Sequence, residues 1–419
     1  MGGKRRIGRR VGAAAVAGVL LATAAAPAVA AGVSERTGTQ RGDAWRGTLV
    51  AAERVFGLPD GRAAAAELTA HGFDAGATRY GVEAWRLVYR TVDEFGQPTT
   101  ASGLLALPSR AAGHRLPVVS YAHGTEVHRD AAPSVHRGFA TAPVVAYASA
   151  GYATVAPDYL GLGLGAGPHP WMDVPSETTA SLDLLRAAGE FAPREGRQLR
   201  REVLVTGFSQ GASAALGLGR ALQAGADDWF RLGALAPVSG AYDFVASQLP
   251  AVLDGRVAPE WAVAYTAYLL VAYDRLHELY ASPAEVFRAP YAETVPELFS
   301  GDHPGQEVMA GLPATLAELL TEEGHALLAA PSGELAQALA ELDSVCRDWR
   351  PRVPVVLWQA GGDEQAVNEN TAACLAALRA GGARPGVRDL GPVEHDGSRH
   401  IGSHVAAVPE IIRWFDRLG

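Results

Sequence analysis

Short apolar runs, each bounded by glycine, proline or charged residues, recur through most of this chain. They lie at 116–121, 152–156, 203–206, 232–238, 353–358 and 387–390, and all but one are followed by helix-forming sequence. A strand that is apolar throughout is buried on both faces, which is typical of a parallel sheet covered by helices on both sides. The sequence therefore predicts an α/β fold with a mostly parallel central sheet.

Two β-rich runs come before this series. They lie at 82–92 and 99–107, and the turn at 93–98 between them predicts a hairpin that makes one edge of the sheet antiparallel. Residues 32–80 have short helical patterns and no site signature, so we predict an N-terminal helical segment there.

The interval 241–350 has helical patterning and no convincing strand. Its centre, 261–273, is apolar almost all round the helix and must be buried on most sides. We predict a helical cap at 241–350, inserted between two parts of an α/β core at 81–240 and 351–419. The apolar residues of the cap either form its own core or line a pocket over the site.

The N-terminus has the pattern of an export signal. Residues 4–10 are basic (KRRIGRR), residues 11–26 are apolar and small, and the A-V-A at 28–30 fits a cleavage site. We therefore expect residues 1–31 to be removed and the protein to be secreted. The apolar run is short for a membrane span, and no later segment has eighteen uninterrupted apolar residues.

Composition excludes several kinds of chemistry. Lys4 is the only lysine and lies in the export signal, so the mature chain cannot form a Schiff base, a Ser-Lys dyad or a P-loop phosphate cradle. A net charge of −9 disfavours nucleic acid and anionic lipid as partners. With no Cys-x-x-Cys, His-Glu-x-x-His or Asp-rich calcium loop, we expect neither a metal nor a cofactor.

Cys346 and Cys374 either form a disulfide, as export would allow, or are two buried free thiols.

A nucleophile motif follows the strand at 203–206. The chain continues as Gly207-Phe208-Ser209-Gln210-Gly211 and then as an Ala- and Leu-rich helix at 212–224. A strand, G-x-S-x-G and a helix in this order form a sharp turn that presents the serine at its apex. We predict Ser209 as the nucleophile; the alternative is a structural glycine-rich turn.

A serine nucleophile needs a base, and without lysine that base is a histidine oriented by a carboxylate. In this architecture the acid follows the penultimate strand, and the histidine follows the last one. Asp363 lies on the loop after the strand at 353–358, and we predict it as the acid. The neighbouring Glu364 fits better as a solvated loop carboxylate.

The C-terminal loop contains three histidines within a near-duplication, H-D-G-S and H-I-G-S. His395 lies five residues after the last strand, which is a common distance. His400 lies close to the final helix, expected at 405–418, whose docking should fix the preceding loop. His404 is expected within that helix already. We favour His400 as the base, with His395 as the alternative.

Acyl transfer also needs N–H groups directed at the developing oxyanion. The backbone N–H of Gln210 is one candidate, because it follows the nucleophile at the positive end of its helix. The second is the N–H of Thr125, after the strand at 116–121, where Gly124 lets the backbone approach. The alternative for this loop is an ordinary strand-terminal turn with a packed His123.

Taken in order, these motifs resemble the secretory lipase family of α/β-hydrolases, which includes fungal lipase-A-like enzymes and exported actinobacterial esterases. The resemblance rests on ASGLLALP at 101–108, SYAHGT at 120–125, GY at 151–152, PDYLGLG at 157–163, HP at 169–170, GFSQG at 207–211 and GDE at 362–364. It implies an α/β-hydrolase fold with an inserted helical cap, and Ser-Asp-His hydrolysis of carboxylic esters, often with lipid-like acyl chains. Members have the histidine about ten residues before a proline in the last helix, which favours His400, before Pro409.

We therefore expect a secreted lipase or esterase that acts on a small-molecule or lipid-like ester of medium chain length or aromatic type. Ala212, Trp171 and the doubled histidine loop depart from the family pattern and bear on substrate preference. The alternatives are a peptidase or amidase of the same fold, or a non-catalytic protein that binds an apolar ligand. The sequence has no signature of an oligomeric state.

Overall fold

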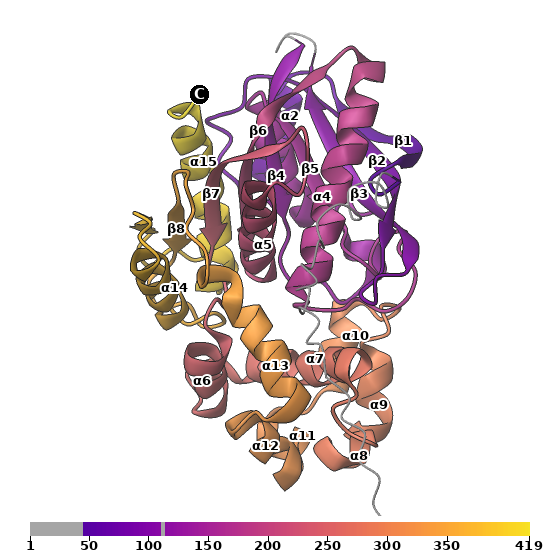
Figure 1. The fold of residues 1–419 in the computed structure, drawn as a ribbon, viewed down its shortest axis with the longest axis vertical. Helices are drawn as coiled ribbons and strands as arrows, with labels where there is room; N and C mark the ends of the chain where they lie inside the picture. Colours follow the sequence, from indigo (N-terminus) through magenta and orange to yellow (C-terminus); the bar gives the residue numbers. More distant parts are fainter. Residues whose placement is uncertain (1–44, 110–113) are drawn as a thin grey trace, which may run out of the picture. The chain divides into compact units, whose positions relative to one another are not determined.

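The computed structural model describes residues 45–109 and 114–419, so the predicted export signal at 1–31 lies outside the described residues. Residues Trp45–Gly419 form one compact unit. Its centre is a nine-stranded sheet in the order β1-β2-β3-β5-β4-β6-β7-β8-β9 (Figure 1). The strands are β1 (Leu49–Leu58), β2 (Val82–Val92), β3 (Pro98–Pro108), β4 (Arg115–Ala122), β5 (Ala153–Pro157), β6 (Gln198–Phe208), β7 (Arg231–Val238), β8 (Val356–Gln359) and β9 (Gly386–Asp389).

The sheet is antiparallel at one edge and parallel elsewhere, as the sequence predicts. β1, β2, β3 and β5 pair antiparallel in succession, whereas the pairs from β5 and β4 through to β8 and β9 are parallel. The β2–β3 hairpin turns at the predicted position. The predicted α/β fold with a mostly parallel sheet is therefore confirmed.

Helices cover both faces of the sheet because alternate strand residues point to opposite sides. On β3, Leu104 and Ala106 belong to the core beneath α2 (Gly61–Ala70), α3 (Ala142–Ser149) and α15 (Arg399–Asp416). Leu105 and Leu107 belong to the core beneath α4 (Val174–Phe191) and α5 (Gln210–Ala224). All four side chains are buried, which explains why β3 is apolar without alternation.

The prediction of a helical segment at 32–80 is wrong for residues 49–58, which form β1. This strand pairs with β2, from Leu49 opposite Tyr89 to Leu58 opposite Val82. Most of its side chains are exposed, so its sequence lacks the apolar alternation of a half-buried strand. The hydrogen-bonding edge of β2 supplies the partner, and such a tertiary contact overrides the local Ala-rich pattern.

Between β7 and β8 the described chain is helical and forms no named strand. The elements are η5 (Phe244–Gln248), α6 (Leu249–Leu253), α7 (Pro259–His277), α8 (Pro283–Val286), α9 (Tyr291–Leu298), α10 (Gly305–Gly311), α11 (Leu316–Leu319), α12 (Glu322–Ala329), α13 (Gly333–Leu342) and η6 (Asp343–Cys346). In Figure 1 the longest of them gather at one end of the sheet, around α7. The division into domains at the predicted boundaries stays a prediction.

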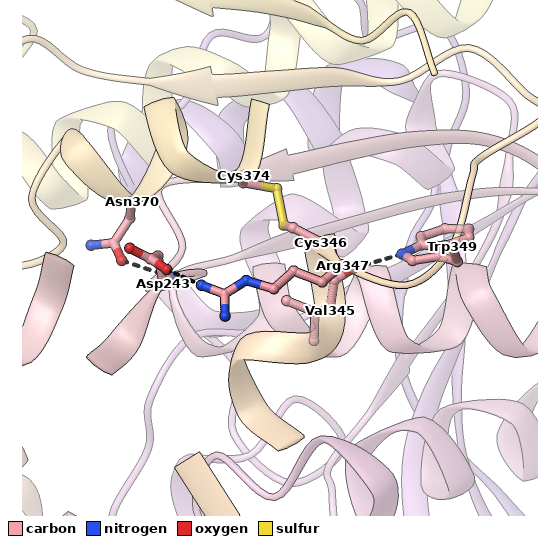
Figure 2. Close-up of a disulfide and its surroundings, with 7 residues drawn as sticks. All are labelled: Asp243, Val345, Cys346, Arg347, Trp349, Asn370 and Cys374. Atoms are coloured by element: carbon pink, nitrogen blue, oxygen red, sulfur yellow. Dashed lines mark hydrogen bonds and ion pairs between the residues drawn. A yellow bond between two sulfur atoms is a disulfide. The ribbon is translucent and has the colours of Figure 1, made fainter. Parts of the chain in front are cut away.

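A disulfide joins the end of this helical region to the helix after β8. Cys346 in η6 is bonded to Cys374 in α14 (Glu369–Ala380), with their Cα atoms 5.1 Å apart (Figure 2). Close by, Arg347 forms an ion pair with Asp243, whose N–H donates to Asn370 Oδ1 at 3.1 Å. The disulfide interpretation is therefore confirmed over two free thiols. The cross-link holds the end of the helical region at α14, and the hydrogen bond of Asp243 holds its start there.

Among the described residues, no helix combines the length and the apolar character that crossing a membrane requires.

Candidate active site

Ser209 lies at the turn between β6 and α5, in the backbone geometry that the motif predicts. Its φ of 55° and ψ of −121° lie in a region that non-glycine residues rarely adopt. A Cβ on Gly207 would collide with the backbone of Gly211, and a Cβ on Gly211 would collide with the backbone of Ala122. The two glycines therefore let strand and helix approach closely enough to hold Ser209 at the apex.

His400 and Asp363 lie next to this serine in a chain of hydrogen bonds. His400 Nε2 is 2.8 Å from Ser209 Oγ, and His400 Nδ1 is 2.8 Å and 3.0 Å from the two Asp363 carboxylate oxygens. Because Nδ1 donates to the carboxylate, Nε2 is left to accept the serine proton. Asp363 Oδ1 also accepts the N–H groups of Gln365 and Ala366 at 2.9 Å, which fixes the carboxylate.

The other two candidate histidines lie elsewhere. Among the described residues, His400 is the only histidine hydrogen-bonded to Ser209. His395 stacks on Phe139, with the rings 5.5 Å apart. His404 is buried and hydrogen-bonded to the Tyr121 hydroxyl at 3.1 Å, and burial lowers its pKa to about 3. The structure thus brings Ser209, His400 and Asp363 together, and their catalytic roles stay a prediction.

The final helix begins earlier than the expected 405, because α15 starts at Arg399 and already includes His400. Ser398 caps it by accepting the Ile401 N–H at 3.1 Å. Glu364 accepts the N–H groups of Arg399 at 3.0 Å and His400 at 3.3 Å. A carboxylate at a helix N-terminus satisfies unpaired N–H groups and interacts favourably with the helix dipole.

The interpretation of Glu364 as a solvated loop carboxylate is therefore wrong, since this side chain is half-buried and holds the helix that carries His400. The loop with Asp363 thus orients the histidine directly and also anchors its backbone. Sequence reasoning missed this role of Glu364. Ser398, two residues before His400, is a residue type that often caps helices and could have indicated that α15 starts early.

The two predicted oxyanion donors lie next to the nucleophile. Gln210 is the first residue of α5, and Thr125 follows β4; both line a cavity that also includes Ser209. Thr125 Oγ1 accepts the indole N–H of Trp171 at 2.9 Å, which ties its loop in place. His123 is packed as the alternative interpretation expects, and burial lowers its pKa to about 4.

The side chain of Gln210 is anchored by two residues that sequence reasoning did not assign. Its Nε2 lies 2.7 Å from Glu177 Oε1 and 2.8 Å from His169 Nε2. His169 Nδ1 bonds the Leu160 carbonyl at 2.9 Å, so the other ring nitrogen is the acceptor. Burial raises the pKa of Glu177 to about 8 and lowers that of His169 to about 3. No sequence signal points to Glu177, because its contact with Gln210 arises only from the packing of α4 on α5.

Two cavities meet at Ser209, with volumes of about 40 Å³ and about 320 Å³. The residues that line both are Thr125, Ser209, Tyr265, Gln365 and His400. Tyr265 belongs to α7, whose Leu269 faces the smaller cavity and whose Tyr268 faces the larger one. Some apolar residues of 261–273 therefore line a pocket over the site, and others, such as Leu270, are core.

The nine-stranded sheet is mostly parallel, and a sharp strand–helix turn presents a serine to a histidine at the start of α15 and to an aspartate on the loop after β8. These features define an α/β-hydrolase. In the described part of the chain, no cluster of three or more His, Cys, Asp or Glu side chains could hold a metal ion.

Comparison with solved structures supports this class of fold. The rice cell wall degrading esterase LipA from Xanthomonas oryzae is 25% identical, with a TM-score of 0.76, over 89% of this chain and 100% of that one. A putative hydrolase from Legionella pneumophila is 23% identical (TM-score 0.79; 88% and 98% covered). Candida antarctica lipase A is 17% identical (TM-score 0.60; 83% and 77% covered). No family model and no curated protein sequence matches the chain.

The protein is an α/β-hydrolase of the esterase and lipase kind, and its activity is that of a carboxylic ester hydrolase. The resemblance stated from the sequence motifs is confirmed at this level.

Proposed function

We propose that the protein is a secreted serine esterase that works through Ser209, His400 and Asp363 by way of an acyl-enzyme. The observation that carries the proposal is the position of His400, with one ring nitrogen 2.8 Å from the serine hydroxyl and the other 2.8 Å from a buried carboxylate. This arrangement suits a base that must take up a proton and then hold a positive charge.

In the first half of the reaction, Ser209 Oγ attacks the ester carbonyl carbon while His400 Nε2 takes the serine proton. The carbonyl oxygen becomes an oxyanion, and the N–H groups of Gln210 and Thr125 stabilise it. The imidazolium then gives its proton to the leaving alcohol as the carbon–oxygen bond breaks. The acyl group remains on Ser209.

In the second half, a water molecule attacks the acyl-enzyme and loses its proton to His400. The tetrahedral intermediate collapses, the proton returns to Ser209 Oγ, and the carboxylic acid leaves. Throughout, the Asp363 carboxylate keeps the imidazole in one tautomer and stabilises its charged form.

The test compares Ser209→Ala with wild type on p-nitrophenyl esters and on the corresponding anilides. We expect the ester rate of Ser209→Ala to fall by about 10⁴-fold or more, as for removal of a triad nucleophile. Ser213→Ala is the matched control, because its buried hydroxyl lies one helical turn later and has no hydrogen-bond partner among the residues that the structure describes. Substantial ester turnover by Ser209→Ala would refute the assignment, and faster anilide than ester cleavage would favour an amidase.

We also infer that the protein is exported and that residues 1–31 are removed. The support is the basic and apolar pattern of residues 4–26 together with the Cys346–Cys374 disulfide, because such bonds form and persist in oxidising compartments. Expression of the full chain should release into the medium a protein whose first residue, measured by mass spectrometry, lies close to 32. Retention of the uncut chain in the cytoplasm would contradict export.

A further inference from the structure

The two cavities at Ser209 share five lining residues and differ in the rest. Among the described residues, Gln210 lines the smaller cavity but not the larger one. The larger cavity instead contains the neighbours of His400, namely Phe208, Ile401 and His404. His400 and Thr125 line both cavities, so Gln210 is the residue that separates the two sides. The acyl carbonyl must face the oxyanion donors, and of the two cavities only the smaller is lined by both Gln210 and Thr125. The smaller cavity is therefore the side of the acyl group, and the larger one, where His400 can give a proton to the leaving group, is the side of the alcohol.

The volumes of the two cavities limit the size of the group that each can hold. A cavity needs about 10–15 Å³ to hold one water molecule. The smaller cavity, of about 40 Å³, thus holds only a few such groups, and its walls are largely apolar. The larger cavity, of about 320 Å³, holds a much bulkier group. A short acyl chain with a bulky alcohol fits this pair better than the medium-length acyl chain expected from the sequence.

Glu126 is the one carboxyl among the described residues that line the larger cavity. The remaining wall is mostly apolar or aromatic, with Phe139, Trp261 and Phe299 among its residues. The backbone carbonyl of Glu126 accepts the Tyr268 hydroxyl at 3.4 Å. Its carboxyl group has no hydrogen-bond or ion-pair partner within the described residues, and the residue is only half-buried, so a ligand in the cavity can supply that partner.

A hydroxyl group of a ligand is the partner that best fits the Glu126 carboxyl. Burial raises the pKa of Glu126 to about 8, so the carboxyl is mostly neutral at pH 7. A neutral carboxyl can both donate a hydrogen bond to a hydroxyl group and accept one from it. It carries no charge with which to attract an alkylammonium group.

We propose that the larger cavity binds the alcohol portion of the ester and that the Glu126 carboxyl forms a hydrogen bond with a hydroxyl group of that alcohol. The substrate class is then an ester of a short carboxylic acid with a bulky, hydroxylated alcohol. This inference rests on the proposed function, and Glu126 acts in it as a specificity residue that takes no part in bond making or breaking.

The test uses pairs of butyrate esters whose alcohols differ only by hydroxyl in place of methyl. The flexible pair is 2,3-dihydroxypropyl butyrate and 2-methylbutyl butyrate, and the rigid pair is 4-(hydroxymethyl)phenyl butyrate and 4-ethylphenyl butyrate. For each pair the measured quantity is the ratio of kcat/KM for the hydroxylated ester to kcat/KM for its isostere. The variants are Glu126→Met, which removes the polar group at similar length, and Glu126→Gln, whose amide still donates and accepts.

We expect Glu126→Met to lower the ratio by about tenfold or more for at least one pair, and Glu126→Gln to keep it within about threefold of wild type. Val308→Ala is the matched control, because it enlarges the same cavity without changing a polar group and should alter both rates of a pair alike. If Glu126→Met does not fold, the test uses two inhibitors of the wild type instead. We then expect 4-(hydroxymethyl)phenol to inhibit more strongly than 4-ethylphenol.

An unchanged ratio in Glu126→Met, with both pairs hydrolysed, would overturn the inference and leave the proposed function standing. A larger effect of the variant on butyrylcholine than on the hydroxylated esters would also overturn it, in favour of a cationic alcohol. Failure of a fluorophosphonate to label Ser209 in the wild type would instead refute the proposed function itself.

Discussion

The buried carboxyl of Glu177 makes the stability of this protein depend on pH in a way that one substitution should remove. Its side chain is 1% exposed, and Oε1 accepts a hydrogen bond from the Gln210 amide at 2.7 Å, while Oε2 has no partner among the described residues. Burial raises the pKa of Glu177 to about 8 in the folded protein, against about 4.3 in an unfolded chain.

The direction in which pH changes the stability follows from proton binding. Between pH 4.3 and pH 8 the folded state keeps the proton on Glu177 and the unfolded state has lost it, so folding takes up a proton. The contribution of this group therefore becomes less favourable by about 1.4 kcal/mol for each pH unit across that window and is constant above it. From pH 5 to pH 7.5 the loss from this one group is about 3 kcal/mol.

Glu177→Gln replaces the neutral acid with a neutral amide that can still accept the bond from Gln210. We expect the free energy of unfolding of the variant, relative to wild type, to rise by about 3 kcal/mol from pH 5 to pH 7.5. Urea unfolding at both pH values measures this difference, and all groups common to the two proteins cancel. Esterase activity should be retained, because Gln210 keeps its anchor.

Glu334→Gln is the matched control, since it removes an exposed carboxyl in the first turn of α13. Its stability relative to wild type should stay within about 0.5 kcal/mol at both pH values. If the Glu177→Gln and wild-type proteins show parallel pH dependence, the neutral, proton-bearing state of Glu177 is refuted.

Three further outcomes test other parts of the fold and site. Glu364→Ala should lower kcat and cost about 1–2 kcal/mol of stability, because it removes the carboxylate that accepts two N–H groups at the start of the helix that carries His400; an unchanged kcat would contradict this positioning role. Gly211→Ala should yield little folded protein, measured by circular dichroism, because the added carbon collides with the Ala122 backbone; normal yield and activity would contradict the collision. Loss of the disulfide that closes 28 residues, in Cys374→Ser with Cys346→Ser, should cost about 3–4 kcal/mol in urea unfolding, and an unchanged midpoint would count against this cross-link.

Apolar patterning predicted the central part of the sheet well, because its strands are buried on both faces and must be apolar throughout. The predicted strands at 116–121 and 232–238, for example, match β4 and β7 to within one residue at each end. The same reasoning failed at β1, whose side chains are mostly exposed and whose strand conformation depends on pairing with β2. An edge strand of this kind leaves little trace in its own sequence.

The sequence by itself determined the nucleophile turn, because two glycines around a serine, after an apolar strand and before a helix, serve a local backbone geometry. It also limited the proposed base to three histidines and placed Asp363, the proposed acid, on the loop after β8. Tertiary structure decided which histidine reaches Ser209, because that choice depends on where α15 begins, and Glu364 from a distant loop fixes its start. It likewise decided the surroundings of Glu126 and Glu177, since the lining of a cavity and a buried hydrogen bond both depend on packing between elements far apart in the chain.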